Sequence, residues 1–201
     1  MVFFSQIKYD NSTTTKDWRD VMSTKQEFLE LVEAEVFHGK KLSYFKKRRY
    51  LADNPGADAV YLIRKMQYHA AQKGRIHKWL ANRAKVTLVR RYSIFVGFKT
   101  KIGKGLRFPH PTGIIIGQTV EIGENCSIFQ NVTIGSRRSG DWKKGLQPHI
   151  GNNVSLFSGC AVIGAITLGD NVQIGANAVM NKDAAPDSIW AGVPAREIRR
   201  D

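Results

Sequence analysis

An aliphatic residue recurs every six positions through most of the C-terminal half of the chain. The recurrence is interrupted between residues 134 and 150, and its frame extends back to Val96 and Ile102. A repeat of this length does not arise by chance, so it constrains the fold more than any other feature of the sequence. The repeat positions are Ile116, Ile122, Ile128, Ile134, Ile150, Leu156, Val162, Leu168, Ile174 and Met180.

A period of six residues fits neither an amphipathic helix nor a long strand. It fits short strands that turn a corner every six residues, with coils that stack at about 4.8 Å and hydrogen-bond to one another. We therefore predict a mainly β fold, a parallel β-helix with the aliphatic side chains inside. Gly follows many of these residues, and we expect it to supply backbone freedom at the corners. Cys126 and Cys160 fall in an inward slot of small residues, which predicts core packing.

The first part of the chain has a pattern typical of helices. It predicts an acidic amphipathic helix over residues 17–38 and one or two helices over residues 61–92, with a break near Gly74. We therefore divide the chain into a helical region, residues 1–93, and a β-helical region, residues 94–201, with an inserted loop at 136–149. The predicted buried stripe of the later helices comprises Leu62, Met66, Ile76, Leu80, Val86 and Val89.

The formal net charge of +14 is concentrated in one third of the chain. Residues 40–104 carry eighteen basic and two acidic side chains, a balance of +16. Such an excess fits an anionic polymer acceptor or peripheral contact with an anionic inner-membrane surface. A solvated helical face is an equal alternative. The segment has no recognised nucleic-acid motif, so no specific nucleic acid is expected. A non-enzymatic basic β-helix that binds nucleic acid is the alternative from a different functional class.

Length and composition narrow the functional classes further. With 201 residues, 42% hydrophobic and 24% charged, the chain suits one globular domain with a helical appendage. No window approaches the roughly 18 consecutive apolar residues of a membrane span, and the first residues do not resemble a signal peptide. We therefore expect a cytoplasmic protein. Two cysteines are too few for a disulfide framework and lack zinc-site spacing, so no metal is expected.

Two departures from the repeat are the places where function is expected. Between Phe108 and Ile116 the spacing is eight residues, and the extra residues lie around His110. Between Ile134 and Ile150 the spacing is sixteen, and the insertion forms a basic, Gly-rich loop.

Several motifs resemble the hexapeptide-repeat acyltransferases, and within them the serine acetyltransferase-like branch. The resemblance covers roughly residues 94–200 and preserves the order and most of the spacing of the motifs. It implies a left-handed parallel β-helix, a homotrimer with active sites between subunits, and transfer of an acetyl group from acetyl-CoA to a hydroxyl. The motifs are LRFPHPTGIIIG, SIFQNVTIG, PHIGNNVSLFSGCAVIG, LGDNVQIGANAVMNKD and AGVPAREI.

His110 matches the catalytic histidine of that family. A hydroxyl attacks a thioester at neutral pH only if a base removes its proton as the new bond forms, and histidine suits this task. The resemblance also implies which residues bind the donor. Small residues would lie along the pantetheine arm, and two basic residues would meet the nucleotide phosphates. These positions are Gly135, Ser136, Ser158, Gly159, Ala176, Lys182 and Arg196.

The acceptor is harder to assign, because charged residues that the branch uses for serine are replaced here. Pro109 stands for an aspartate, and Leu146 and Gln147 stand for an arginine and a histidine. We therefore expect a sugar hydroxyl of a bacterial surface or capsular polysaccharide, or of its precursor, as the acceptor. The alternative is a serine O-acetyltransferase of cysteine biosynthesis. Candidate acceptor contacts are Trp142, Gln147, His149 and Asp53.

Overall fold

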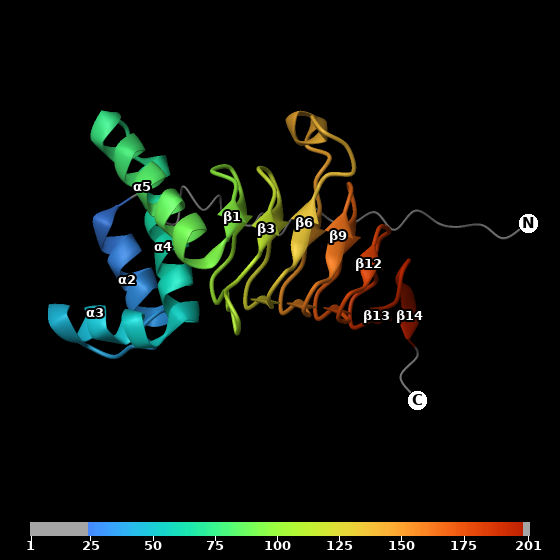
Figure 1. The fold of residues 1–201 in the computed structure, drawn as a ribbon, viewed down its shortest axis with the longest axis horizontal. Coiled ribbons are helices and arrows are strands. Elements are labelled where there is room, and N and C mark those ends of the chain that lie inside the picture. The colour runs from blue at the N-terminus through green and yellow to red at the C-terminus, as the bar shows by residue number, and fades with distance from the viewer. Residues whose placement is uncertain (1–23, 199–201) are drawn as a thin grey trace, which may run out of the picture.

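The computed structural model describes residues 24–198, in which a group of helices is followed by a coil of short strands (Figure 1). The helices lie together at one end of the coil, and the inserted loop stands out from its side near β6. The helices of the described residues are α2 (Lys25–Glu35), α3 (Tyr44–Asp53), α4 (Pro55–Ala71), α5 (Arg75–Tyr92) and the short 3-10 helix η1 (Asp141–Lys144) in the loop.

Short strands form three sheets that run along the coil. Face A consists of β1, β3, β6, β9 and β12, face B of β2, β4, β7 and β10, and face C of β5, β8, β11, β13 and β14. All neighbouring strands pair in parallel except β13 and β14. The predicted parallel β architecture with helices before it is confirmed. The strand bounds are β1 Phe95–Val96, β2 Lys101–Ile102, β3 Ile115–Ile116, β4 Glu121–Ile122, β5 Ser127–Ile128, β6 Thr133–Gly135, β7 His149–Ile150, β8 Ser155–Leu156, β9 Ala161–Ile163, β10 Thr167–Leu168, β11 Gln173–Ile174, β12 Val179–Met180, β13 Ile189–Ala191 and β14 Arg196–Ile198.

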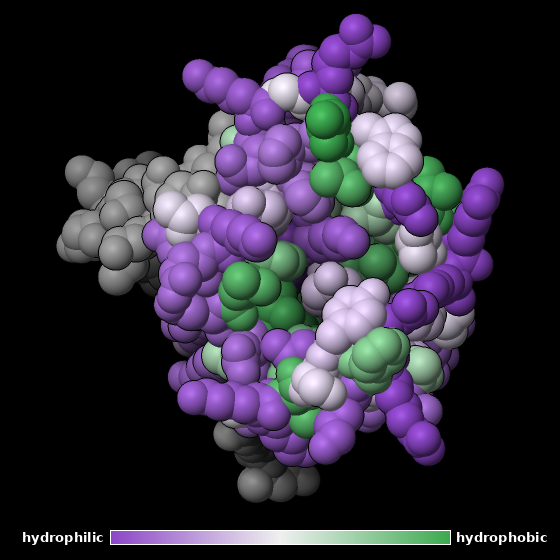
Figure 2. Space-filling model, turned by 90° about the vertical axis from the view of Figure 1, so that its left-hand side faces the viewer, coloured by the Kyte–Doolittle hydropathy of each residue, from purple (hydrophilic) through white to green (hydrophobic). Residues whose placement is uncertain are grey.

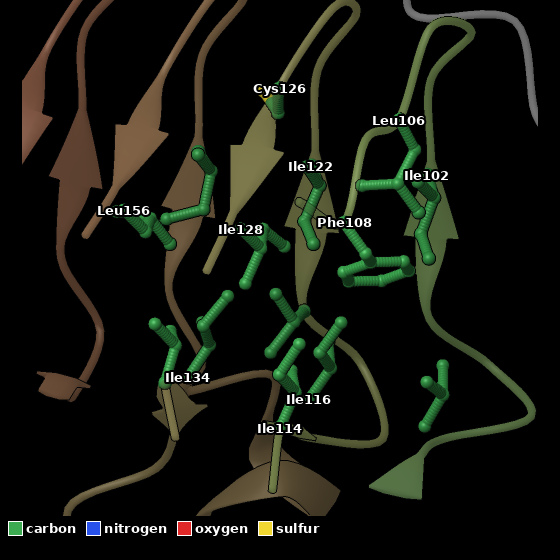
Figure 3. Packing of buried hydrophobic residues seen from close by; sticks show 14 of the residues in the cluster. Ile102, Leu106, Phe108, Ile114, Ile116, Ile122, Cys126, Ile128, Ile134 and Leu156 are labelled. Atoms are coloured by element: carbon green, nitrogen blue, oxygen red, sulfur yellow. The ribbon is translucent and has the colours of Figure 1, made fainter. Parts of the chain in front are cut away.

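The aliphatic residues of the repeat stack on one another inside the coil (Figure 3). Ile116 pairs with Ile134 on face A, and Ile128 pairs with Leu156 on face C. Every repeat position is at most 5% exposed. Because parallel pairing keeps each coil in register with the next, the six-residue period becomes three continuous inner rows of apolar side chains.

The glycines that follow these aliphatic residues have a different function from the one we expected. Gly103 and Gly123 are not in the positive-φ region, so they do not supply unusual backbone freedom. A Cβ on either would lie 2.6 Å from backbone atoms of the next coil. Close approach between coils therefore excludes a side chain. The positive φ of the corners falls on other residues, among them Asn125, Asn153 and Gly159.

The helices agree with the sequence patterns in part. Thr24 caps α2 and forms a reciprocal capping box with Glu27, while the predicted start of this helix, residues 17–23, lies outside the described residues. Helices α4 and α5 are separated at Gly74, as predicted. The basic run at residues 44–53, for which no helix was predicted, forms α3. Within residues 24–198, none of the helices combines the length and the apolar character that a membrane span requires.

The predicted buried stripe is correct for α4 and only partly correct for α5, where Leu80 and Val89 are half-buried. Leu62 and Met66 are buried, but Ile76 and Val86 are exposed. The buried face of α5 consists instead of Ala81, Ala84 and Leu88. Small alanines allow α4 and α5 to pack closely. Side-chain size therefore matters at this interface, and a hydrophobic periodicity does not indicate it.

A buried ion pair joins the helices to the coil. Arg64 of α4 donates from Nε and Nη2 to the two carboxylate oxygens of Glu35 at 2.7 and 2.8 Å, and both side chains are almost completely buried. The guanidinium also donates to the carbonyls of Ile102 and Gly103, and Glu35 accepts from the Leu106 N–H at 2.9 Å. The pair therefore sets the position of α2 and α4 on the first coil.

Both cysteines lie in the core, and their reactivity provides a test of the packing. Burial raises the pKa of the Cys126 thiol to about 11 and that of Cys160 to about 12. We expect neither thiol to react with Ellman's reagent at pH 8 in the folded protein, and both to react after unfolding in urea. The pKa of a thiol in the unfolded chain is lower than the pKa of these buried thiols. Burial of the two neutral thiols therefore contributes its full stability at pH values below the unfolded pKa, and this contribution is lost as the pH rises through the folded pKa values. Rapid reaction of the folded protein would contradict this packing.

Candidate functional site

One corner of the coil joins face C to face A, and we refer to its turns, residues 109–113, 129–132, 157–160 and 175–178, as the histidine corner. The same hydrogen bond recurs in successive turns: Asn131 N–H donates to Thr112 O, Gly159 N–H to Gln130 O, and Asn177 N–H to Ser158 O, each at 2.9 Å. The residue that donates adopts positive φ, which Gly and Asn tolerate. The turns are therefore stacked copies of one conformation.

His110 departs from this stack. The first turn has two more residues than the others, and His110 lies in the resulting bulge between Pro109 and Pro111. Its carbonyl accepts from the Thr112 N–H at 2.9 Å, which tightens the turn. The side chain is exposed and has no hydrogen-bond partner among residues 24–198. Its ring centroid lies 6.2 Å from that of Phe129, so the imidazole is accessible and has an apolar surface on one side.

Small residues follow His110 along the same corner. Ser158 and Gly159 occupy the turn after that of Phe129, and Ala176 occupies the next turn. Phe157 stacks on Phe129 with ring centroids 5.1 Å apart. The structure thus places His110 and three of the proposed donor-binding residues on one corner, with aromatic rings beside a strip of small side chains.

The other candidates lie mainly on the corner that joins face A to face B, which includes the inserted loop and which we name the loop corner. Trp142 lies in η1, and its carbonyl accepts from Thr119 Oγ1 at 3.4 Å. Gln147 is 2% exposed, and its Oε1 is buried without a hydrogen-bond partner among the described residues. Ser136 begins the loop, and Lys182 lies on the same corner two coils further on, with its ammonium 4.9 Å from the ring centroid of Trp190. One protomer therefore does not bring these residues to His110.

His149 and Arg196 lie on the faces of the coil. His149 Nδ1 is 3.3 Å from Glu121 Oε2, and Glu121 Oε1 is 2.6 Å from Lys101 Nζ, so the three side chains form an exposed row on face B. Arg196 is exposed on β14, at the end of the coil that is far from the helices (Figure 1). Within residues 24–198, no three His, Cys, Asp or Glu side chains form a group that could hold a metal ion.

Gly135 differs from the glycines inside the coil stack. It ends β6 on face A, it is not in the positive-φ region, and a Cβ built on it meets no atom within 4 Å. By contrast, a Cβ on Gly117 would lie 2.6 Å from Gln147 Oε1. The packing of the protomer therefore does not require glycine at position 135, and the open space beside it is available to another molecule.

Sequence reasoning missed a polar cluster that joins α4 to α5 next to the first turn of the histidine corner. Asp58 Oδ2 accepts from Arg91 Nη1 at 2.7 Å and from Tyr92 Oη at 2.8 Å, joining the first turn of α4 to the end of α5. The hydrogen bond to Asp58 raises the pKa of Arg91, and burial raises that of Tyr92 to about 12. The Asp58 carboxylate is buried, whereas the Arg91 side chain is 58% exposed.

This cluster lies close to the turn that holds His110. The Gly113 N–H donates to the carbonyl of Tyr92 at 3.1 Å, and a Cβ on Gly56 would lie 2.4 Å from the carbonyl oxygen of Phe108. Asp58 is one of two acidic residues in the basic segment 40–104, which was the available signal in the sequence. The candidate Asp53 ends α3, is exposed, and pairs with Arg49 at 3.6 Å.

Comparisons with known proteins agree with the motifs. Residues 147–182 match the family described as bacterial transferase hexapeptide (six repeats). The serine acetyltransferase of Helicobacter pylori J99 is 43% identical over 101 residues, covering 50% of this chain and 58% of the relative. That of Haemophilus influenzae is 35% identical over 144 residues, covering 67% of this chain and 52% of the relative. The chain thus spans little more than half the length of these curated relatives.

Solved structures show the same fold over most of the described chain. A soybean serine acetyltransferase apoenzyme has a TM-score of 0.70 at 24% identity and covers 89% of this chain and 72% of the soybean chain. A serine acetyltransferase in complex with CoA has a TM-score of 0.68 at 22% identity, covering 89% of this chain and 73% of the other. The coverage extends beyond the β-helical region, so the helices belong to the shared fold.

These findings correct the expectation of a polysaccharide acceptor, which is wrong. The relatives found are serine acetyltransferases, and they support the alternative that the sequence left open. The error lay in treating the replaced residues at positions 109, 146 and 147 as a loss of charge from the site. Charge near a site also comes from other elements, and here Arg91 of α5 precedes Tyr92, whose carbonyl accepts from the Gly113 N–H of the turn that holds His110. The resemblance of this chain to the hexapeptide-repeat transferases, and within them to the serine acetyltransferases, is confirmed.

Proposed function

We propose that the chain is an acyltransferase that moves an acetyl group from acetyl-CoA to the hydroxyl of L-serine, with His110 as the general base. The observation that carries the proposal is the exposed imidazole of His110 on a bulged turn, beside a corner strip of small residues. The serine acetyltransferase relatives support the choice of donor and acceptor. The cytoplasmic location expected from the sequence is part of this proposal.

The chemistry requires one base and a site for the thioester. His110 accepts the proton of the serine hydroxyl as the hydroxyl oxygen attacks the thioester carbonyl carbon. The carbon–sulfur bond breaks, and the departing CoA sulfur takes up the proton. No acyl-enzyme intermediate is needed, because serine attacks the donor directly. The two prolines beside His110 restrict the backbone of the turn and so keep the imidazole in place.

The donor would lie along the coil on residues with small side chains. Ser158, Gly159 and Ala176 leave the backbone of the histidine corner accessible, and Gly135 and Ser136 do the same where β6 ends. A pantetheine arm carries amide groups that bind to such exposed backbone. The basic side chains proposed for the nucleotide phosphates are Lys182 and Arg196.

The acceptor needs groups for an ammonium and a carboxylate. We assign the carboxylate to Arg91, whose guanidinium is oriented by the buried Asp58 and is still largely exposed. Trp142 of the loop corner and His149 of face B are proposed as acceptor contacts from a neighbouring subunit. Gln147, which is buried in the protomer, would join them when the loop moves. Asp53, at the end of α3, is the remaining candidate.

The separation of the candidates over two corners favours an assembly with sites between subunits. Face A lies between the histidine corner and the loop corner, and its outward row includes Phe95 and Ile115, which are 48% and 45% exposed. Exposed apolar residues in a row are typical of an interface. We propose a homotrimer of left-handed coils in which the histidine corner of one subunit meets the loop corner of the next.

Gly135→Ala tests donor binding without disturbing the core. We expect the KM for acetyl-CoA to rise by about tenfold, a loss of about 1.4 kcal/mol in binding, because the methyl group occupies the space left for the donor. The thermal midpoint should stay unchanged, since a Cβ meets no atom of the protomer. Steady-state kinetics and thermal unfolding measure both quantities. Thr167→Ala, on exposed face B, is the control, and an unchanged KM for acetyl-CoA would remove Gly135 from the donor site.

The proposal itself is tested by acceptor-dependent release of CoA. The purified protein is incubated with acetyl-CoA and L-serine, D-serine, a simple sugar or no acceptor, and the CoA thiol and O-acetylserine are measured. L-serine should give CoA and O-acetylserine in equal amounts. No acetylation of L-serine, or equal CoA release without an acceptor, would contradict the proposal.

A further inference from the structure

The helical end of the molecule exposes large apolar and aromatic side chains. Tyr44 and Phe45 at the start of α3 are 67% and 80% exposed, and Ile76 and Trp79 near the start of α5 are 73% and 57% exposed. Figure 2 shows this end, where green and pale apolar or aromatic surface lies among long hydrophilic side chains that project outward. We name the exposed surface of α3 and of the first half of α5 the basic end.

Charge is concentrated on the same part of the molecule. The described helical residues 24–92 carry 16 Lys and Arg and 6 Asp and Glu, a balance of +10. The described coil, residues 93–198, carries 10 and 7, a balance of +3. The acidic residues of α2 are included in the first count, so they do not cancel the excess. The molecule therefore has a strongly basic end and a nearly neutral coil.

The apolar and basic side chains of the basic end are interleaved. On α5, Ile76, Trp79 and Arg83 are spaced by three and four residues and share one exposed side of the helix. The Arg83 guanidinium lies 5.3 Å from the ring centroid of Trp79. On α3, Tyr44 and Phe45 pack edge to face and are followed directly by the basic residues 46–49. Both helices thus present rings together with cations.

We propose that the basic end docks on a bilayer that contains anionic phospholipids, with α3 and α5 lying at the headgroup level. Lys and Arg are attracted to the negative surface, while Trp, Tyr and Phe favour the boundary between headgroups and acyl chains. The surface thus complements a membrane in charge and in polarity. The coil extends away from the basic end (Figure 1), so the histidine corner and the loop stay accessible in the docked protein.

Two other occupants fit less well. A nucleic-acid duplex bound through its phosphates would use the cations, but it would leave the exposed Ile76 and Phe45 without an apolar partner. A second copy packed end to end would bring two surfaces of high positive charge together, which is unfavourable. Both are outcomes that the experiment below separates from lipid binding.

Vesicle sedimentation tests the proposal with the full chain. Vesicles of phosphatidylcholine with phosphatidylglycerol should bind the protein at least about tenfold more tightly than vesicles of phosphatidylcholine alone, and raised salt should weaken the binding. The fluorescence of Trp79, obtained as the difference between the protein and Trp79→Phe, should shift to shorter wavelength on binding. Equal binding to both vesicles, or no binding, would overturn the proposal.

Paired variants separate docking from general charge or hydrophobicity. Phe45→Ser with Trp79→Ser should lower vesicle affinity about tenfold or more, and Arg48→Glu with Arg49→Glu should do the same. The matched controls are Val193→Ser, 71% exposed near the far end of the coil, and Arg137→Glu with Arg138→Glu in the loop. Equal losses in controls and test variants would overturn the proposal. The proposal would also be overturned if the protein bound DNA or RNA in a gel-shift assay instead of vesicles. It would be overturned as well if light scattering showed that the basic end joins copies of the protein into larger oligomers.

Discussion

Replacement of His110 by Ala is expected to lower kcat for acetyl transfer to serine by about 10²- to 10⁴-fold, the usual contribution of a general base. The side chain is exposed and makes no hydrogen bond within the described residues, so its removal should leave the fold unchanged. The KM for acetyl-CoA should change little, because the proposed role of the imidazole is to act on the acceptor hydroxyl. Steady-state kinetics at saturating acetyl-CoA, together with circular dichroism, measure these effects.

Controls for this variant distinguish loss of the base from loss of the site. His38→Asn replaces an exposed histidine that has positive φ, which Asn tolerates, and it should leave kcat unchanged. His110→Gln retains polarity without a useful base and should be as slow as His110→Ala. If either His110 variant keeps most of its turnover, His110 is not the base.

Arg64→Met is expected to lower the free energy of unfolding by about 3–5 kcal/mol, because it leaves a buried carboxylate without its partner. Glu35 would keep only the Leu106 N–H, and the carbonyls of Ile102 and Gly103 would each lose a donor. Urea unfolding at constant protein concentration measures the loss, with the concentration held constant because subunit association would also affect the midpoint.

An exposed ion pair provides the matched control for Arg64. Arg49→Met removes the pair with Asp53, whose side chains are 87% and 64% exposed, and it should change stability by no more than about 1 kcal/mol. The double variant Glu35→Leu with Arg64→Met should recover much of the loss, since no charge is then left buried. Similar losses for Arg64→Met and Arg49→Met would show that the buried pair does not hold the helices on the coil.

Periodicity predicted the coil better than the helices, for a physical reason. In the coil, each inward residue stacks on a counterpart in the next coil, sixteen or more positions away, so one pattern determines strand, corner and core together. In α5, which packs against α4, the buried residues are Ala81, Ala84 and Leu88, whereas the larger Ile76 is exposed. A pattern of hydrophobicity does not reveal which side of a helix meets a partner.

Some residues of the candidate site could likewise be predicted from the sequence, and others could not. His110 could be found because the two-residue insertion around it changes the spacing of the repeat in the sequence. The Asp58–Arg91–Tyr92 cluster could not, because its members are 33 and 34 residues apart and meet only when α4 and α5 pack above the first turns.

The sequence by itself determined the parallel coil, its apolar interior and the bulged turn that exposes His110, since each follows from local spacing along the chain. Only the tertiary structure decided which glycines are required by close contact, that Glu35 and Arg64 join helices to coil, and that candidate residues lie on two different corners. These features depend on contacts between segments distant in sequence, where packing distance and charge pairing, rather than local pattern, select the residue.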